Sequence, residues 1–129
     1  MPSKFLPIPK MERDYKKYIG SEDNFQKRVA LYLDFRNAVY FHCPNGGKRN
    51  QMEAQKLKQM GVKAGVPDIM ILDRRHGFHG LAIELKVGSN TPTAHQLRWL
   101  KVLHGLGWLA WVAWSLDEVV DLIDWYYGD

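Results

Sequence analysis

The sequence predicts an α/β fold in which helices flank a mixed β-sheet. Helical and strand-like hydrophobic patterns alternate along most of the chain. Two strand-like runs at 68–73 and 81–87, joined by a polar turn, indicate a β-hairpin. A nearly all-apolar run at 108–114 is typical of a strand that is buried on both faces. A hairpin and a doubly buried strand in one chain together favour a mixed sheet.

The composition is that of one ordinary globular domain. The chain has 129 residues, of which 46% are hydrophobic and 25% charged, which excludes a disordered or collagen-like chain. The single cysteine, Cys43, excludes an intrachain disulfide and a cysteine-based zinc site and favours a reducing compartment. Neither a signal peptide nor an apolar stretch long enough for a membrane span is visible. We therefore expect a cytoplasmic protein without a membrane partner.

The N-terminal part of the chain predicts an irregular lead-in followed by a helix. Residues 1–20 carry three prolines and scattered lysines, so the domain is expected to occupy 21–129. Ser21 is a good N-cap, and acidic residues follow it in the first turn. Apolar residues at helical spacing then predict a helix over 22–36.

The middle of the chain predicts one strand, a basic helix and then the two hairpin strands. Residues 38–42 look like a short strand that ends at the turn residues 44–47. A short basic helix is expected over 52–60, closed by Gly61. The hairpin strands follow.

The C-terminal part predicts helix, strand, helix. Thr91 as N-cap and Pro92 at the first helical position open a helix that runs to about residue 106. The apolar strand comes next, and 116–127 forms a last helix. Its aspartates are expected along one solvated stripe: Asp117, Asp121 and Asp124. This helix is apolar over much of its remaining surface, which suggests a second buried contact such as a dimer interface.

Charge is distributed unevenly along the chain. The net charge is +4, but residues 1–67 carry +7 and residues 68–129 carry −3. A basic region of this kind attracts anions, and nucleic acid is the commonest such partner. The alternative is a charge asymmetry that serves only solubility.

The hairpin carries the residues with the clearest chemistry. Glu84 and Lys86 lie two apart in one strand and so share a face, and a hairpin can bring Asp68 beside Glu84. Paired carboxylates repel each other unless a divalent cation binds between them, and hard oxygen ligands favour Mg²⁺ or Mn²⁺. A nearby lysine can orient or help deprotonate a water for phosphodiester hydrolysis. The alternatives are a strand-initiating aspartate after Pro67 and a structural ion pair.

These residues resemble a known nuclease signature. Val66-Pro67-Asp68, followed by Ile83-Glu84-Leu85-Lys86, resembles the PD…(D/E)xK motif of restriction-endonuclease-like nucleases. Further segments resemble the VRR-NUC branch of that superfamily, in its stand-alone phage and bacterial form. They are residues 42–50, 56–72, 80–88 and 91–108. The resemblance covers about residues 21–125 and implies a restriction-endonuclease-like core.

The resemblance also implies roles for individual residues. Asp68 and Glu84 match the metal ligands, with the backbone carbonyl of Leu85 as a further ligand, and Lys86 matches the catalytic lysine. Glu22 matches a helix-borne carboxylate that contacts the metal directly or through water.

A glutamine of the next long helix also has a counterpart in that family. Gln96 matches a residue that supports the site, and it lies in a row with Leu100 and Leu103 that faces the sheet. Helix spacing alone would equally allow Gln96 to be a core glutamine, and Glu22 to stabilise the N-terminus of its helix.

A DNA-binding surface is expected on the basic segment. Its candidate residues are Asn45, Lys48, Arg49, Lys56, Lys58 and Lys63. Any one of these side chains could instead be part of a solvated loop. The tryptophans at 99, 108, 111 and 114 are expected in the core rather than as platforms for bases.

Together these features predict a metal-dependent DNA endonuclease with no small-molecule substrate. By resemblance, we expect branched or four-way (Holliday) junction DNA as substrate, a homodimer, and, for a phage-encoded protein, the cytoplasm of the bacterial host. The alternatives are a nickase, a flap nuclease or a relaxed duplex nuclease with the same chemistry, and a non-catalytic DNA-binding module.

Overall fold

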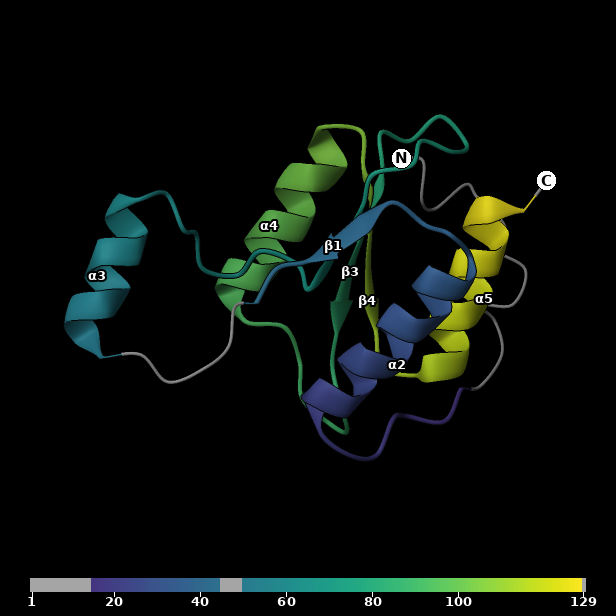
Figure 1. Cartoon of the computed structure of the whole chain (residues 1–129), viewed down its shortest axis with the longest axis horizontal. Helices are drawn as coiled ribbons and strands as arrows, with labels where there is room; N and C mark the ends of the chain where they lie inside the picture. Colours follow the sequence, from purple (N-terminus) through teal and green to yellow (C-terminus); the bar gives the residue numbers. More distant parts are fainter. Residues whose placement is uncertain (1–14, 45–49, 129) are drawn as a thin grey trace.

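A four-stranded mixed sheet with the order β1-β2-β3-β4 organises the chain. The computed structural model describes residues 15–44 and 50–128. Helices α2 and α5 lie on one side of the sheet and α4 on the other (Figure 1). The elements are α2 (Glu22–Phe35), β1 (Tyr40–His42), α3 (Gln51–Gln59), β2 (Ile69–Ile71), β3 (Leu81–Leu85), α4 (Ala94–Gly105), β4 (Leu109–Ala113) and α5 (Leu116–Tyr127). Their order within the described residues is the predicted one, and the predicted α/β class with a mixed sheet is confirmed.

The strand pairing follows the predicted hairpin. Strands β2 and β3 are antiparallel, with Ile69 opposite Ile83. Strands β3 and β4 are parallel, with Leu81 opposite Leu109, and α4 forms the crossover between them. Both hairpin strands are rich in fully buried aliphatic residues, so their register is fixed by the core.

Strand β4 differs from the prediction of burial on both faces. Leu109 and Ala113 are buried, but the three residues between them are half-buried. The cause is topology, because β4 pairs with β3 alone and forms an edge of the sheet. The half-buried position suits the indole of Trp111, whose Nε1–H donates a hydrogen bond to Glu118 at 3.1 Å.

Helix α2 forms as its sequence predicts. The Ser21 hydroxyl accepts a hydrogen bond from the Asn24 amide at 3.1 Å and caps the helix. Phe25, Val29 and Leu33 are fully buried and form the row that packs on the sheet and on α5. This row holds α2 in a fixed position relative to β3.

Helix α4 begins later than predicted. Its N-cap is Thr93, not Thr91, and Pro92 precedes the helix instead of opening it. The Thr93 hydroxyl accepts from the Gln96 amide at 3.2 Å, and Gln96 Oε1 accepts from the Thr93 amide at 2.8 Å. This capping box satisfies two backbone donors at once, which a lone cap at Thr91 would not do.

The expected solvated stripe of aspartates on α5 is wrong. Asp121 is buried and accepts a hydrogen bond from the Tyr15 hydroxyl at 2.7 Å. Asp124 pairs with Arg36 of α2 at 2.8 Å, and only Asp117 is exposed. Two of the three aspartates therefore join α5 to the rest of the fold, because α2 and the lead-in cover that side of the helix.

The apolar surface of α5 is likewise covered within one chain. Helix α2 packs along α5 (Figure 1). Four residues of α5 are fully buried without any second copy: Val119, Leu122, Ile123 and Tyr126. The apolar surplus of α5 thus reflects contact with α2 as well as with the sheet, and it is no longer a reason to expect a dimer.

The described part of the lead-in is irregular and packs onto the fold. The Tyr18 ring stacks on Phe25 with centroids 4.6 Å apart. The Tyr18 amide donates to the Trp114 carbonyl at 2.6 Å, and its carbonyl accepts from Gly88 at 3.3 Å. Over residues 15–44 and 50–128, none of the helices has the length and apolarity that a membrane span requires.

Candidate active site

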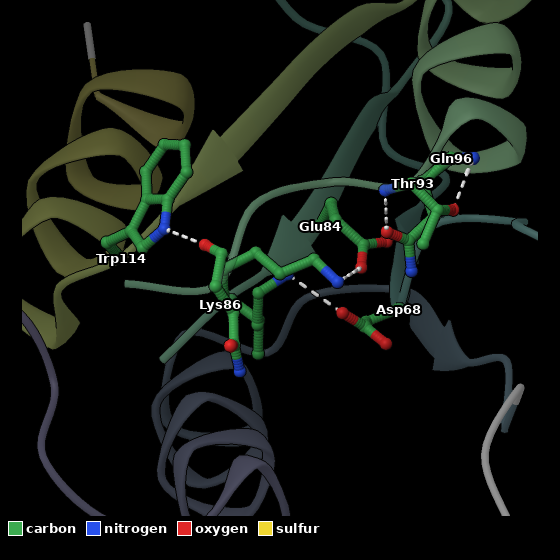
Figure 2. A network of polar contacts seen from close by, with 8 residues as sticks. Asp68, Glu84, Lys86, Thr93, Gln96 and Trp114 are labelled. Atoms are coloured by element: carbon green, nitrogen blue, oxygen red, sulfur yellow. Dashed lines mark hydrogen bonds and ion pairs between the residues drawn. The ribbon is translucent and has the colours of Figure 1, made fainter. Parts of the chain in front are cut away.

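The hairpin brings the predicted acidic residues together at one end of the sheet. Since β2 and β3 pair with Ile69 opposite Ile83, continuing the register by one residue places Asp68 opposite Glu84. Lys86 lies just beyond the end of β3, and its side chain extends toward Glu84 (Figure 2). Three residues separated in sequence thus converge at the site.

Asp68 is held by both neighbouring strands. Its Oδ2 accepts a hydrogen bond from the Leu85 amide at 2.8 Å. Its backbone carbonyl accepts from the Cys43 amide at 3.0 Å, and the His42 Nδ1 lies 2.8 Å from the same oxygen. His42 is therefore a positioning residue for Asp68 that the sequence analysis did not assign. The only indication of this role in the sequence is that His42 comes just before the turn at 44–47.

Glu84 and Lys86 are buried side by side. Their side chains share one face of the strand, as their spacing predicts, and Lys86 Nζ lies 3.6 Å from Glu84 Oε2. The residues are only 2% and 7% exposed, respectively. The other carboxylate oxygen, Glu84 Oε1, is buried and has no hydrogen-bond partner among the described residues. A buried acceptor without a partner is costly, so this oxygen is available for a ligand.

Burial dominates the electrostatics of the two carboxyl groups. Burial first, and then the nearby Asp68 charge, raise the pKa of Glu84 to about 8, against the opposing effect of Lys86. Burial also raises the pKa of Asp68, opposed mainly by the hydrogen bond from Leu85. Two neighbouring carboxylates, one buried and one half-buried, repel each other when both are ionised, and a divalent cation relieves that repulsion.

The donor set fits a hard cation with few protein ligands. No group of three or more His, Cys, Asp or Glu residues suited to a metal occurs in the described ranges 15–44 and 50–128. Two carboxylates and a backbone carbonyl are instead the kind of set that Mg²⁺ accepts, because Mg²⁺ keeps several of its waters. The residues present therefore fit Mg²⁺ or Mn²⁺ better than zinc.

Glu22 is not brought into contact with the hairpin carboxylates. It is exposed in the first turn of α2, and no hydrogen bond or ion pair joins it to Asp68 or Glu84 among the described residues. One turn further, Gln26 has a buried Oε1 that lacks a hydrogen-bond partner in the described part of the chain. Helix α2 packs against β3, so this helix still borders the strand that carries the site.

Gln96 caps its helix, and its side chain lies near the hairpin carboxylates (Figure 2). Its Oε1 belongs to the capping box at the start of α4. Its side chain also extends toward Glu84 (Figure 2), and α4 packs against β3. It is half-buried, while Leu103 in the same row is buried, so the row does face the sheet. The cap fixes the orientation of the carboxamide.

The basic residues expected to contact DNA are partly described. Lys56, Lys58 and Lys63 are exposed on α3 and the segment after it, and α3 stands apart from the sheet (Figure 1). Asn45, Lys48 and Arg49 lie outside the described residues. Trp99, expected in the core, instead lines a surface groove beside α3. The other three tryptophans are half-buried at or beside β4.

A mixed sheet flanked by helices, with Asp68 opposite Glu84 on one hairpin and Lys86 two residues after Glu84, matches the arrangement of nuclease domains of the PD-(D/E)xK type. Comparison with solved structures identifies the family within this class. One solved structure, titled "VRR_NUC domain protein", shares 33% identity and a TM-score of 0.71, covering 85% of this chain and 91% of that chain. This chain belongs to the VRR_NUC domain family.

A second solved structure agrees in fold. It is titled "VRR_NUC domain" and has a TM-score of 0.56 at 23% identity, covering 82% of this chain and 97% of that chain. No family model and no curated protein matches the sequence. The family resemblance predicted from the motifs is thus confirmed through three-dimensional structure.

Proposed function

We propose that this protein is a divalent-metal-dependent DNA endonuclease that hydrolyses phosphodiester bonds. The observation that carries the proposal is the pairing of the half-buried Asp68 with the buried Glu84, with the Lys86 ammonium 3.6 Å from Glu84. Such a group of charges is costly to bury without a ligand. A bound cation would balance the two carboxylates, and a phosphate of the DNA would balance the Lys86 ammonium.

Asp68, Glu84 and the Leu85 backbone carbonyl would hold Mg²⁺ or Mn²⁺, and Glu22 would act through a water. When bound, the metal lowers the pKa of a water and neutralises charge on the phosphate. The hydrogen bond from the Leu85 amide fixes Asp68, and the orphaned Glu84 Oε1 is free to bind the cation. A cation held there would favour the ionised form of Glu84, whose pKa is raised to about 8 mainly by burial.

Lys86 would supply a fixed positive charge beside the scissile phosphate. Burial restricts the Lys86 ammonium, and the ion pair with Glu84 holds it beside the carboxylates. From there it can orient the attacking water or assist its deprotonation. Gln96, held by the capping box, would position its amide beside the same carboxyl group.

The substrate would be branched DNA, with a four-way junction as the favoured form, cut by a homodimer. The exposed lysines of α3 would contact phosphates without reading sequence. A symmetric dimer presents two equivalent sites, which suits cutting two strands of one junction. The half-exposed apolar side chains of Val39, Phe41 and Leu72, at the β1–β2 edge of the sheet, offer a surface for the second copy.

A cleavage assay tests the proposal. Labelled four-way junction and linear duplex DNA are incubated with the wild type in Mg²⁺, Mn²⁺ or chelator. We expect metal-dependent cutting with preference for the junction, and a loss of about 100-fold or more in Glu84→Ala and Lys86→Ala. Asp117→Ala, which removes an exposed carboxylate on α5, is the matched control and should cut as the wild type does.

The outcome also separates an enzyme from a binding module. Lys86→Ala should still bind junction DNA, because one buried ammonium contributes little to the DNA-binding surface. Wild-type protein that binds DNA but cuts none in any metal would overturn the nuclease proposal. Equal cutting of junction and duplex would overturn the junction preference alone.

A further inference from the structure

A groove lies between α3 and α4, outside the catalytic group. Its volume is about 630 Å³, within the range of roughly 300–1,000 Å³ that is usual for ligand sites. Its lining residues are Ala54, Leu57, Lys58, Val62, Lys63, Ala64, His95, Arg98, Trp99 and Val102.

The two walls are regular helix faces. On α4, the lining residues His95, Arg98, Trp99 and Val102 recur at the spacing of one face, while Leu103 belongs to the row on the sheet. On α3, the lining residues Ala54, Leu57 and Lys58 likewise lie three and four apart, on one face of the helix. Helix α3 buries no residue, and Asn50 caps it through a hydrogen bond from the Glu53 amide at 2.7 Å. The groove therefore lies between α4, which packs on the sheet, and α3, which is capped but buries no residue.

The lining combines positive charge with an apolar and aromatic surface. Lys58, Lys63 and Arg98 supply cations, and no Asp or Glu is among the lining residues. Trp99 presents a half-buried indole, with Val62 and Val102 partly exposed nearby. Cations next to an aromatic ring are the combination that binds a nucleic-acid strand, phosphates on the cations and a base on the ring. A duplex offers no free base face to such a ring.

The groove adjoins the active site through two short links. His95 on the groove wall directly precedes Gln96, and Ala64 lies four residues before Asp68. Gly65 packs against the start of α4 so closely that a Cβ there would lie 2.6 Å from the His95 carbonyl carbon. One continuous piece of backbone thus forms the groove wall and then delivers Asp68.

We propose that the groove between α3 and α4 binds an unpaired stretch of the DNA strand, with a base on Trp99 and phosphates on Lys58, Lys63 and Arg98. This inference rests on the proposed nuclease function and names a feature of branched DNA that the domain would recognise, namely nucleotides that lose their pairing at the branch point. The groove holds a strand beside the site and takes no part in hydrolysis itself.

Binding of labelled oligothymidylate, measured by fluorescence anisotropy in chelator, tests this site without cleavage. Trp99→Leu should bind about tenfold more weakly, whereas Trp99→Phe should retain most of the affinity because a ring remains. Arg98→Gln should also weaken binding and lower the salt dependence by about one phosphate contact. Lys101→Gln, an exposed residue of α4 that does not line the groove, is the matched control and should bind as the wild type does.

Three results would overturn the proposal. They are wild-type affinity in both Trp99→Leu and Arg98→Gln, absence of oligothymidylate binding by the wild type, and a groove variant that changes the mass in solution, which would assign the groove to a second copy. In each of these cases, a wild type that cuts duplex DNA in the presence of metal would leave the nuclease proposal intact. If the wild type cuts no DNA but its strand binding depends on the groove residues, the nuclease proposal fails and the groove proposal holds.

Discussion

At the scale of single residues, Glu84 makes the stability of the metal-free protein depend on pH. The unfolded group titrates near 4.5 and the folded group at about 8. Between these values the folded protein keeps a proton that the unfolded chain has lost. We therefore expect the free energy of unfolding to fall by a few kcal/mol as pH rises from about 5 to 8, measured by urea denaturation in chelator.

The control for this prediction is Glu84→Gln, which imitates the protonated carboxyl group. Its stability should change much less over the same pH range and exceed that of the wild type at pH 8. Mg²⁺ should raise the stability of the wild type more than that of the variant. Parallel pH profiles for the two proteins would contradict the raised pKa.

Thr93 and Gln96 allow the cap to be separated from the active site. Thr93→Ala removes half of the capping box and should lower the free energy of unfolding by about 1 kcal/mol while leaving cleavage intact. Gln96→Ala should cost similar stability and also reduce cleavage, since its carboxamide extends toward Glu84. The measurements are thermal melts and junction-cutting rates. Equal cutting rates in the two variants would restrict Gln96 to the cap.

The site residues on the hairpin were predictable because local rules place them. The two-residue spacing fixes Glu84 and Lys86 on one face, and antiparallel pairing fixes Asp68 opposite Glu84. The contact of His42 was not predicted and Trp99 was placed in the core, because both positions depend on contacts between distant segments. His42 reaches Asp68 across the β1–β2 pair, and Trp99 lines a groove because of the position of α3.

At the scale of elements, Gly65 determines how the segment before β2 meets α4. Its φ of +84° is strained for other residues, and an added Cβ would also meet the His95 backbone at 2.6 Å. Gly65→Ala should therefore lower the free energy of unfolding by about 3 kcal/mol and weaken oligothymidylate binding. Chemical denaturation measures the first effect and anisotropy the second.

Gly61 provides the matched control for that substitution. Its φ is +101°, but no atom lies within 4 Å of an added Cβ. Gly61→Ala should cost only the backbone strain, about 1 kcal/mol. Equal losses in the two variants would show that the contact between Gly65 and His95 contributes nothing.

The elements themselves were predictable wherever the sequence carries a cap or an uninterrupted period. Helix α2 begins after Ser21, and α5 has the predicted bounds. The start of α4 was misplaced because Thr91-Pro92 is a good helix start on its own, while the capping box of Thr93 and Gln96 satisfies more donors. Strand β4 looked doubly buried because its apolar run does not reveal that it lies at an edge.

At the scale of the whole molecule, the residues that the structure describes (15–44 and 50–128) cover one half of the sheet on one face only. Tyr40 faces α2, since its hydroxyl donates to the Ala30 carbonyl at 3.2 Å. Phe41 and Val39 therefore point to the other face, where α4 packs on β3 and β4. Val39 pairs with Leu72 through a backbone hydrogen bond of 2.7 Å. All three side chains are about half exposed, at 55%, 48% and 46% for Val39, Phe41 and Leu72.

This open apolar half-face is the surface on which we expect the second copy to pack. Apolar side chains grouped on a sheet next to an unpaired edge strand favour association, and a two-fold axis there would place the same patch on both sides of the interface. Light scattering at micromolar concentration should give a mass twice that of the 15.0 kDa chain. Phe41→Lys should give the monomer mass, because two lysines would then face each other across the axis. Leu31→Lys, at an exposed leucine of α2 away from this face, should remain a dimer. A wild type of monomer mass would contradict the dimer, and a dimeric Phe41→Lys variant would move the interface to another face of the molecule.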